Sequence, residues 1–209
     1  MSGEETELNG LGPEITADAL ESLFHKLDRL TKGDVIVLAG SIPKSMPDDI
    51  YEKILERLCE REIRAVVDAT GNLLLNVLKY KPYLIKPNNF ELAEMFCTEL
   101  STNEDIIKYA GRLRDMGAQN VLVSMAEKGA ILVDENKEVH ICPVCKGEVR
   151  NSVGAGDSMV AGFLAGWLEK KSYEYAFHMG LAAGSASAFS EKLATSEEVA
   201  MVYQKSFLC

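Results

Sequence analysis

The sequence has no run of apolar residues long enough to span a bilayer, and its first residues are acidic and polar, unlike the basic and then apolar start of a signal peptide. It also lacks an excess of positive charge: 22 Lys and Arg residues stand against 32 Asp and Glu residues, for a formal net charge of -10. Nucleic acids and anionic membranes are bound by clustered Lys and Arg, so the composition argues against both as partners. We expect a cytoplasmic protein that binds a small molecule.

Paired metal-binding cysteines are scarce. The chain has five cysteines, an odd number that fits reduced thiols better than a disulfide framework. The segment Cys142-Pro143-Val144-Cys145 is one Cys-x-x-Cys, and no second pair follows at zinc-ligand spacing. His140 is a possible third ligand, but it lies on the same short apolar run. The pattern favours two thiols in the core or on an edge strand over a metal or redox site, which is the weaker alternative.

The composition and periodicity predict one α/β domain over residues 1–209. With 209 residues, 47% of them hydrophobic, the chain can bury one good core. Short apolar runs alternate with amphipathic helices, which predicts a mostly parallel sheet with helices on both faces and an antiparallel hairpin at its end. The predicted strands are 34–39, 64–68, 83–86, 120–124, 129–133 and 139–142. The predicted helices are 17–33, 48–61, 72–79, 90–97, 103–116, 155–169, 173–189 and 196–207, with Thr16 as the first N-cap.

Residues 151–163 read NSVGAGDSMVAGF and are the most informative segment. Gly154 and Gly156 allow a ligand to approach the backbone closely, just where a helix begins. The free N–H groups of that helix start and the helix dipole favour an anion. Asp157, in the first turn, can accept a proton from a hydroxyl that attacks phosphorus. The segment predicts phosphoryl transfer with Asp157 as base, although a tight turn with a capping carboxylate is an alternative for the four residues Gly-x-Gly-Asp alone.

Two common nucleotide-binding motifs are absent. Met159 stands where the dinucleotide fingerprint has its third glycine, and no Gly-Lys-Ser/Thr occurs for a P-loop. Residues 151–163 instead resemble the C-terminal signature of the PfkB (ribokinase-like) family of carbohydrate kinases at every position. The resemblance implies a ribokinase-like three-layer α/β fold and an ATP-dependent reaction. It also implies that Gly154, Ala155 and Gly156 form the anion hole and that Asp157 is the catalytic base.

Polar and glycine-rich residues follow the predicted strands repeatedly. Gly40 and Ser41 follow the first strand, residues 68–71 the second, residues 86–88 the third and Ser124 the fourth. Ligands of open parallel sheets bind outside the carboxyl ends of the strands. The sequence therefore predicts a polar ligand site at this edge of the sheet.

The segment 86–91, Lys-Pro-Asn-Asn-Phe-Glu, puts a cation, an amide and a carboxylate close together after a strand. The family resemblance implies that Lys86 meets nucleotide phosphates and that Asn88 and Glu91 hold water ligands of Mg²⁺. Such an arrangement suits an ion that keeps several waters. The alternative is structural: Asn88 caps a helix and Glu91 completes a capping box.

Two further segments resemble nucleotide-binding parts of the family. Ser124 and Gly129 flank a loop that is similar to the family's nucleotide loop, with a simple turn as the alternative. Leu181 and Ser185 lie in a helix segment rich in small residues, and the resemblance implies that they line the adenine pocket. Close helix packing would leave the same pattern.

Residues 38–43 and 6–13 are similar to segments of the 1-phosphofructokinases and tagatose-6-phosphate kinases of this family. The resemblance implies that Gly40 and Ser41 lie near the sugar phosphate. The leading hypothesis is transfer of the γ-phosphoryl group of ATP to fructose 1-phosphate, giving fructose 1,6-bisphosphate. The alternatives are tagatose 6-phosphate or another sugar as acceptor and, in another class, a non-catalytic nucleotide-binding module.

The chain resembles the C-terminal two thirds of a family member, without the N-terminal strands and the β lid over the sugar. From this we expect retained nucleotide contacts with little or no turnover in the isolated chain, because transfer depends on positioning and water exclusion. We also expect an exposed apolar sheet edge, which would favour a homodimer or other self-association.

Overall fold

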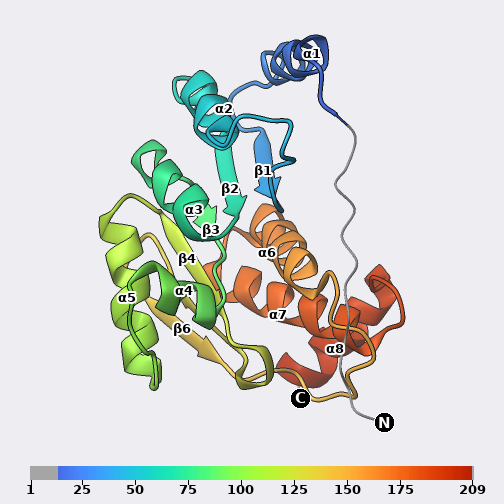
Figure 1. The fold of residues 1–209 in the computed structure, drawn as a ribbon. Helices are drawn as coiled ribbons and strands as arrows, with labels where there is room; N and C mark the ends of the chain where they lie inside the picture. Colours follow the sequence, from blue (N-terminus) through green and yellow to red (C-terminus); the bar gives the residue numbers. More distant parts are fainter. Residues whose placement is uncertain (1–13, 209) are drawn as a thin grey trace.

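The computed structural model describes residues 14–208, so the predicted subgroup segment 6–13 lies outside the described residues. The described chain forms one six-stranded sheet in the order β1-β2-β3-β4-β5-β6 (Figure 1). Strands β1 to β4 pair in parallel, and β5 and β6 pair antiparallel. The strands are β1 (Val35–Ala39), β2 (Arg64–Asp68), β3 (Leu84–Ile85), β4 (Asn120–Ser124), β5 (Ala130–Val133) and β6 (Val139–Cys142). This confirms the predicted mostly parallel sheet with a terminal hairpin.

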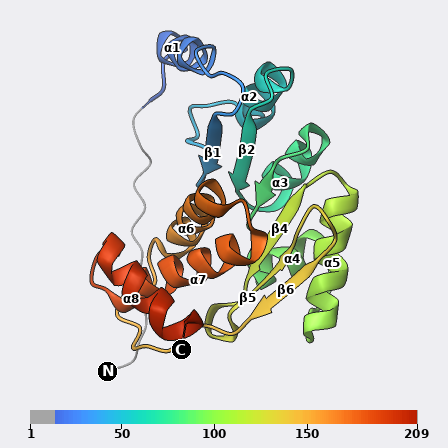
Figure 2. The same ribbon diagram turned by 180° about the vertical axis from the view of Figure 1, so that it is seen from behind.

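Helices lie on both faces of the sheet, as Figures 1 and 2 show from opposite sides. Helices α2 to α5 cover one face, α6 and α7 cover the other, and α8 packs on α7. The helices are α1 (Ala17–Leu27), α2 (Ile50–Leu58), α3 (Gly71–Val77), α4 (Asn89–Met95), α5 (Asn103–Asp115), α6 (Ala155–Lys170), α7 (Tyr173–Phe189) and α8 (Ser196–Phe207), with short 3-10 helices η1 (Leu78–Tyr80) and η2 (Ala126–Lys128). No helix in residues 14–208 combines the length and apolar character needed to cross a membrane.

The strand residues alternate between two hydrophobic cores, because successive side chains of a strand point to opposite faces. Val67 on β2 packs in the core under α2 to α5, whereas its neighbour Val66 packs in the core under α6 and α7. On β4, Val121 and Val123 belong to the first core and Leu122 to the second. The three-layer arrangement therefore follows from apolar residues on both faces of the inner strands.

The largest differences from the predicted boundaries concern α1 and β3. Helix α1 ends at Leu27, well before Gly33. Strand β3 holds only Leu84 and Ile85, and it ends just before Lys86-Pro87, because proline has no N–H to donate to a sheet ladder. The short strand leaves Lys86 at its carboxyl end, next to the end of β2.

Helices α6 and α7 approach each other closely through glycines. A Cβ added at Gly162 would lie 2.5 Å from the carbonyl oxygen of Met179. A Cβ at Gly180 would lie 2.9 Å from the carbonyl oxygen of Met159, and one at Gly184 would lie 3.0 Å from that of Ala155. The small residues of this helix pair are therefore required by packing, which is the structural alternative that the sequence offered for the segment around Leu181.

Candidate active site

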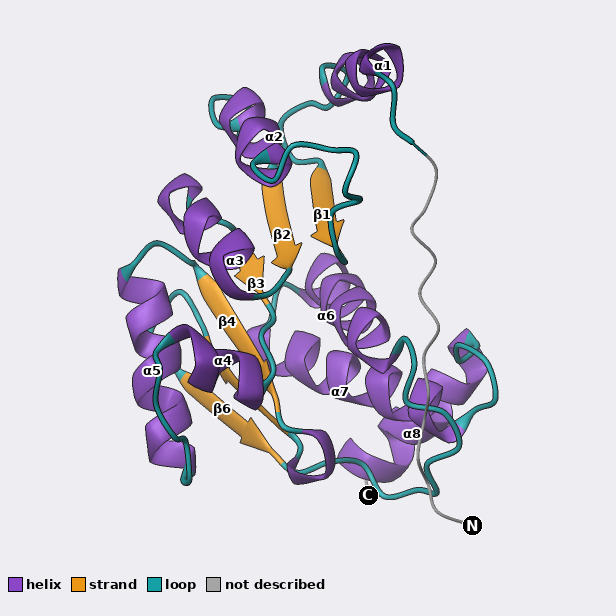
Figure 3. Ribbon diagram, viewed as in Figure 1, coloured by secondary structure: helices purple, strands orange, loops and turns teal. Residues whose placement is uncertain are grey.

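The glycine turn opens a helix, as predicted. Gly154 is the N-cap of α6 and has a left-handed backbone, with φ of 80°, which glycine adopts without strain. A Cβ at Gly154 would also lie 2.6 Å from Cδ2 of Leu193. Helix α6 then begins at Ala155 and places Asp157 in its first turn. Figure 3 shows the arrowheads of β1 and β2 pointing toward α6.

The amides of this helix start are only partly available to a ligand. The N–H of Ala155 donates to the carbonyl of Ser152 at 3.2 Å, so Ala155 does not offer its amide as the anion-hole prediction requires. For the N–H groups of Gly156 and Asp157, the described chain supplies no hydrogen-bond acceptor. The anion site that the turn offers includes these two amides and the helix dipole.

Asp157 is exposed and lines a cleft of about 670 Å³ at the carboxyl ends of β1 and β2. Gly40 and Ser41, the predicted sugar-phosphate residues, line the same cleft. The structure therefore brings these three residues together at the edge of the sheet for which the sequence predicted a polar ligand site. Further lining residues are Ile42, Asp48, Asp68, Ala69, Thr70, Asn72, Leu73 and Asn76.

Lys86 lies at the junction of the cleft and the glycine turn. Its side chain is only 8% exposed, and its Nζ lies 3.3 Å from Oδ1 of Asp68. The same Nζ lies 3.2 Å from the position that a Cβ of Gly156 would occupy. Glycine at 156 therefore leaves room for the ammonium group beside the helix start. This places a cation where the prediction expects nucleotide phosphates.

Asp68 was not among the predicted site residues, although its place at the end of β2 was recognised as part of the polar edge. Burial raises the pKa of its carboxyl, the Lys86 ammonium lowers it, and the nearby carboxylates of Asp157 and Glu91 raise it. Asp68 therefore interacts electrostatically with three charged residues, namely Lys86, Asp157 and Glu91. The signal in the sequence was an aspartate at the carboxyl end of a buried strand, the usual place for functional side chains in parallel sheets.

Tyr51 is a second residue that the sequence did not indicate. Its hydroxyl donates to the carbonyl oxygens of Ala39 at 2.9 Å and Gly40 at 3.2 Å. These bonds connect helix α2, which carries Tyr51, to the turn after β1 and hold that turn in place. Burial raises the pKa of Tyr51, and the charge of Asp68 adds to this shift. Nothing local marks a buried tyrosine in an amphipathic helix as part of a site.

Asn88 and Glu91 form the capping box of α4. Oδ1 of Asn88 accepts the N–H groups of Phe90 at 2.9 Å and Glu91 at 2.8 Å, while Oε2 of Glu91 accepts the N–H of Asn88 at 2.8 Å. The structural alternative is thus realised. The box does not exclude a magnesium role, because a carboxylate carries more acceptor sites than the single bond occupies, and Asp68 and Asp157 add negative charge nearby. The side-chain oxygens of these residues fit a hydrated Mg²⁺.

Ser124 lies beside Asn88, as the nucleotide-site prediction requires. The two residues form an isolated parallel β-bridge, and the N–H of Ser124 donates to the carbonyl of Pro87 at 3.1 Å. Gly129 follows the short helix η2 with φ of 93°, and a Cβ there would lie 2.1 Å from the carbonyl oxygen of Cys142. The glycine at 129 is therefore explained by backbone packing, whether or not a nucleotide contacts it.

Leu181 and Ser185 are buried on α7, at 1% and 6% exposure. Leu181 packs in the core with Phe163 and Phe177. Their surroundings are those of close helix packing, and an adenine contact by these two residues stays a prediction.

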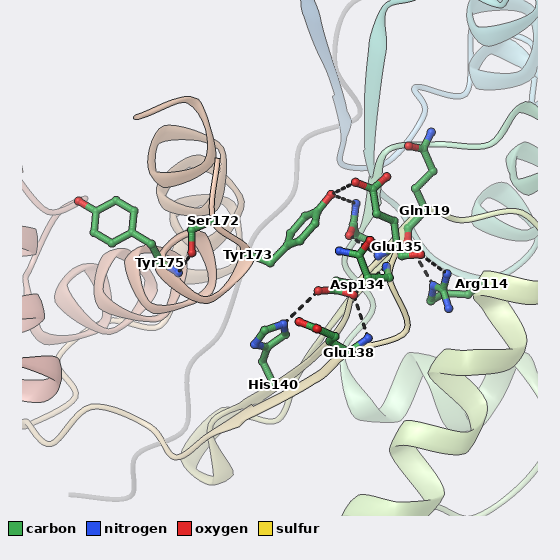
Figure 4. Close-up of polar contacts among 11 residues, drawn as sticks. Arg114, Gln119, Asp134, Glu135, Glu138, His140, Ser172, Tyr173 and Tyr175 are labelled. Carbon is green, nitrogen blue, oxygen red and sulfur yellow. Dashed lines mark hydrogen bonds and ion pairs between the residues drawn. The ribbon is translucent and has the colours of Figure 1, made fainter. Parts of the chain in front are cut away.

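A separate polar cluster closes the β5–β6 hairpin (Figure 4). The buried carboxylate of Asp134 accepts the N–H groups of Asn136 and Glu138, both at 2.9 Å, and its Oδ2 lies 3.1 Å from Nε2 of His140. His140, considered above as a metal ligand with the cysteines, thus contacts Asp134. These bonds account for the buried carboxylate. Cys142 and Cys145 are free thiols, the first on β6 and the second buried.

Beside this hairpin, the hydroxyl of Tyr173 donates to Oε1 of Glu135 at 2.6 Å. Oδ1 of Asn120 accepts the N–H of Glu135 at 2.9 Å. These bonds tie the hairpin turn to β4 and to the start of α7, at the edge of the sheet away from the cleft.

Comparison with known proteins shows the family to which the chain belongs. The model of the family described as pfkB family carbohydrate kinase matches residues 1–200. The chain is 47% identical over 198 residues to the 1-phosphofructokinase of Bacillus subtilis, a match that covers 95% of this chain and 65% of that protein. It is 34% identical over 193 residues to the D-tagatose-1-phosphate kinase of Bacillus licheniformis, covering 92% of this chain and 63% of that protein.

Among solved structures, the phosphofructokinase-2 of Escherichia coli in complex with fructose-6-phosphate superposes with a TM-score of 0.89. It is 27% identical, and the match covers 98% of this chain and 67% of that one. The chain spans less than two thirds of the length of the two relatives above. Because the family model matches nearly all of its residues, the chain belongs to the pfkB family of carbohydrate kinases.

Proposed function

We propose that this chain carries the nucleotide site and the catalytic base of an ATP-dependent kinase that phosphorylates fructose 1-phosphate to fructose 1,6-bisphosphate. The observation that carries the proposal is that Asp157 faces the cleft at a helix start where the N–H groups of Gly156 and of Asp157 itself have no hydrogen-bond acceptor in the described chain. The 47% identity to a 1-phosphofructokinase supports this acceptor.

In the proposed reaction, the primary hydroxyl oxygen of the sugar phosphate bonds to the γ-phosphorus, and the bond from that phosphorus to the β,γ-bridging oxygen breaks. The hydroxyl proton passes to the carboxylate of Asp157 as the new bond forms. The amides of Gly156 and Asp157 and the ammonium of Lys86 are placed to offset the negative charge of the transferring group. ADP is the leaving group.

Asn88 and Glu91 would hold Mg²⁺ through water. When bound, the ion neutralises phosphate charge and orients the nucleotide. The residues of the chain contribute acceptor oxygens that the capping box fixes in place. Ser124, Gly129, Leu181 and Ser185 are the proposed contacts to the rest of the nucleotide, and the position of Ser124 next to Asn88 supports its part in this set.

A panel of acceptors, assayed with the intact protein, decides the preferred sugar phosphate. Fructose 1-phosphate is the expected best acceptor, and Gly40 and Ser41 are the proposed residues near its phosphate. Tagatose 6-phosphate is the alternative from the sequence. The 34% identity to a D-tagatose-1-phosphate kinase adds tagatose 1-phosphate to the panel. A higher kcat/KM for either tagatose phosphate would overturn the proposed acceptor.

The Asp157→Asn variant tests the base in the intact protein, because little or no turnover is expected of the isolated chain. We expect turnover to fall by about two to four orders of magnitude, the usual contribution of a positioned general base, with ATP affinity nearly unchanged. Glu169→Gln, at the other end of α6, is the matched control and should keep its rate. Full activity in Asp157→Asn would contradict the mechanism. ATP binding by the intact protein without turnover of any acceptor would favour the non-catalytic nucleotide-binding module.

Self-association is a further proposal. One solved relative, the phosphofructokinase-2 of Escherichia coli, is described as tetrameric in its inhibited form. In the described chain, β1 is an edge strand, and Val37 on it is 46% exposed. Unpaired strand edges with apolar side chains favour pairing with a second chain. We propose that copies of this chain associate through β1.

A further inference from the structure

Asp68 places a negative charge in a cleft that we propose binds a phosphate. Its Oδ1 lies 3.3 Å from Nζ of Lys86, and the charges of Asp157 and Glu91 also act on it. Burial of the carboxyl disfavours its charged form. By charge alone, Asp68 would repel an anionic ligand and weaken its binding.

The surroundings of Lys86 point to a different role for Asp68, as the partner of the lysine ammonium. The lysine side chain has a flexible four-carbon stem and is only 8% exposed, so its ammonium would be strongly destabilised without a partner. The Asp68 carboxylate supplies the partner and fixes where Nζ lies. That place is 3.2 Å from the Cβ position of Gly156, at the start of α6.

The backbone holds the two residues in register. Strands β2 and β3 pair in parallel with Val67 opposite Ile85, so Asp68 and Lys86 follow at adjacent strand ends. The N–H of Lys86 donates to the carbonyl of Val67 at 3.3 Å, and the N–H of Gly40 donates to the carbonyl of Asp68 at 3.2 Å. The pair is thus built on sheet elements, which position side chains more rigidly than loops do.

We propose that Asp68 is a positioning residue that holds the Lys86 ammonium beside the amides of Gly156 and Asp157. The terminal phosphates of a nucleotide then meet a cation that is already in place, so that less side-chain freedom is lost on binding. This inference rests on the proposed function, because it assumes that a nucleotide phosphate binds at the glycine turn.

Charge repulsion by Asp68 and positioning of Lys86 by Asp68 predict opposite changes in ATP affinity when the charge of Asp68 is removed. Asp68→Asn keeps the side-chain size and removes the charge. We expect it to weaken binding of ATP with Mg²⁺ to the full chain by about tenfold, the size of one charge-assisted hydrogen bond, in a calorimetric titration. Unchanged or tighter binding would overturn the proposal, because loss of repulsion alone predicts tighter binding.

Two controls isolate the role of Lys86. Asp49→Asn removes the same charge from an exposed residue that pairs with Lys53 at 2.8 Å, and it should leave ATP affinity unchanged. In a Lys86→Met background, Asp68→Asn should no longer weaken binding, because no ammonium is left to position. A further tenfold loss in that background would show that Asp68 acts without Lys86 and would contradict the inference.

Urea unfolding of the same variants tests the pair without a nucleotide. Asp68→Asn and Lys86→Met should each lower the midpoint, and the double variant should lose less than the sum, because removing both partners leaves no unpaired buried charge. If a single variant fails to fold and the double variant folds, the two residues are coupled even more strongly. Additive losses would overturn the positioning role. Failure of the unmodified chain to bind ATP would instead contradict the proposed function.

Discussion

Asn88 and Glu91 hold each other at the start of α4: the Asn88 side chain accepts the N–H of Glu91 at 2.8 Å, and the Glu91 carboxylate accepts the N–H of Asn88 at 2.8 Å. The same two residues are the proposed holders of Mg²⁺. A capping box and a metal role use different properties of Glu91, namely one acceptor oxygen and the negative charge. The two roles can therefore be separated by experiment.

Glu91→Gln keeps an acceptor for the N–H of Asn88 and removes the charge. Since glutamine also completes a capping box, we expect the unfolding midpoint to stay close to that of the unmodified chain. The Mg²⁺ concentration needed for ATP binding should rise roughly 10- to 100-fold, as for other outer-shell metal partners. Calorimetry over a series of Mg²⁺ concentrations measures this, with Glu94→Gln on the same helix as control. An unchanged Mg²⁺ requirement would leave Glu91 with the capping role alone.

Gly162→Ala should destabilise the fold through the contact of α6 with α7. The added methyl would lie 2.5 Å from the carbonyl oxygen of Met179 and 2.6 Å from Cβ of Ala183, so one helix must shift. We expect a loss of about 1–3 kcal/mol in the free energy of unfolding, measured by urea denaturation. Gly111→Ala on α5 is the matched control. Nothing lies within 4 Å of its Cβ position, so a gain of about 0.5–1 kcal/mol is expected. Equal effects would argue against close packing of α6 and α7.

Asp28 should make the fold sensitive to acid. Its carboxylate accepts two bonds from Arg57, at 2.7 and 2.6 Å, and these bonds, with smaller contributions from the charges of Arg57, Arg61 and His25, lower its pKa in the folded state. Because the folded pKa lies below the unfolded one, the pair stabilises the fold above about pH 4, and this stabilisation is lost as the pH falls further. Asp28→Asn should reduce the urea midpoint at pH 7 and reduce its fall between pH 4 and about pH 2.

The Arg57→Gln variant checks the same pair from the other side. It should flatten the acid limb of the stability profile as Asp28→Asn does, and the two substitutions together should add little to either alone. Unchanged steepness in both variants would show that other carboxylates carry the acid sensitivity.

Val37→Lys should reduce self-association of the chain. A lysine on an edge strand opposes pairing with a second strand, and Val37 is exposed on β1. Sedimentation velocity over a concentration series measures the effect. Ile141→Lys on β6, the other edge of the described sheet, is the comparison variant, since Ile141 is 52% exposed. A monomer at every concentration before substitution, or dissociation caused only by Ile141→Lys, would contradict association through β1.

The layered fold could be predicted because its signals are local. Apolar runs such as Arg64–Asp68 and Asn120–Ser124 appear as strands with the predicted bounds. Capping residues such as Thr102 and Thr195 mark helix starts through side chains that bond to amides three residues on. Hydrophobic alternation and capping depend on neighbours in the sequence, so they can be identified from the sequence alone.

The candidate site could be predicted only in part. The glycine turn and Asp157 belong to one segment, and their places follow from helix-start chemistry. The engagement of the Ala155 amide by Ser152 was missed, because it depends on how the turn closes. Asp68 and Tyr51 were missed as site residues because their importance lies in contacts with Lys86 and Gly40.

The sequence by itself determined the order of strands and helices, the turn that opens α6 and the membership of a kinase family, because each rests on residues close together in the chain. Only the tertiary structure decided that the Lys86 ammonium lies between Asp68 and Gly156, and that the small residues around Leu181 serve helix packing. These contacts join segments far apart in the sequence. They arise when strand register and helix packing bring the segments together. No local sequence pattern predicts how close such segments will lie in space.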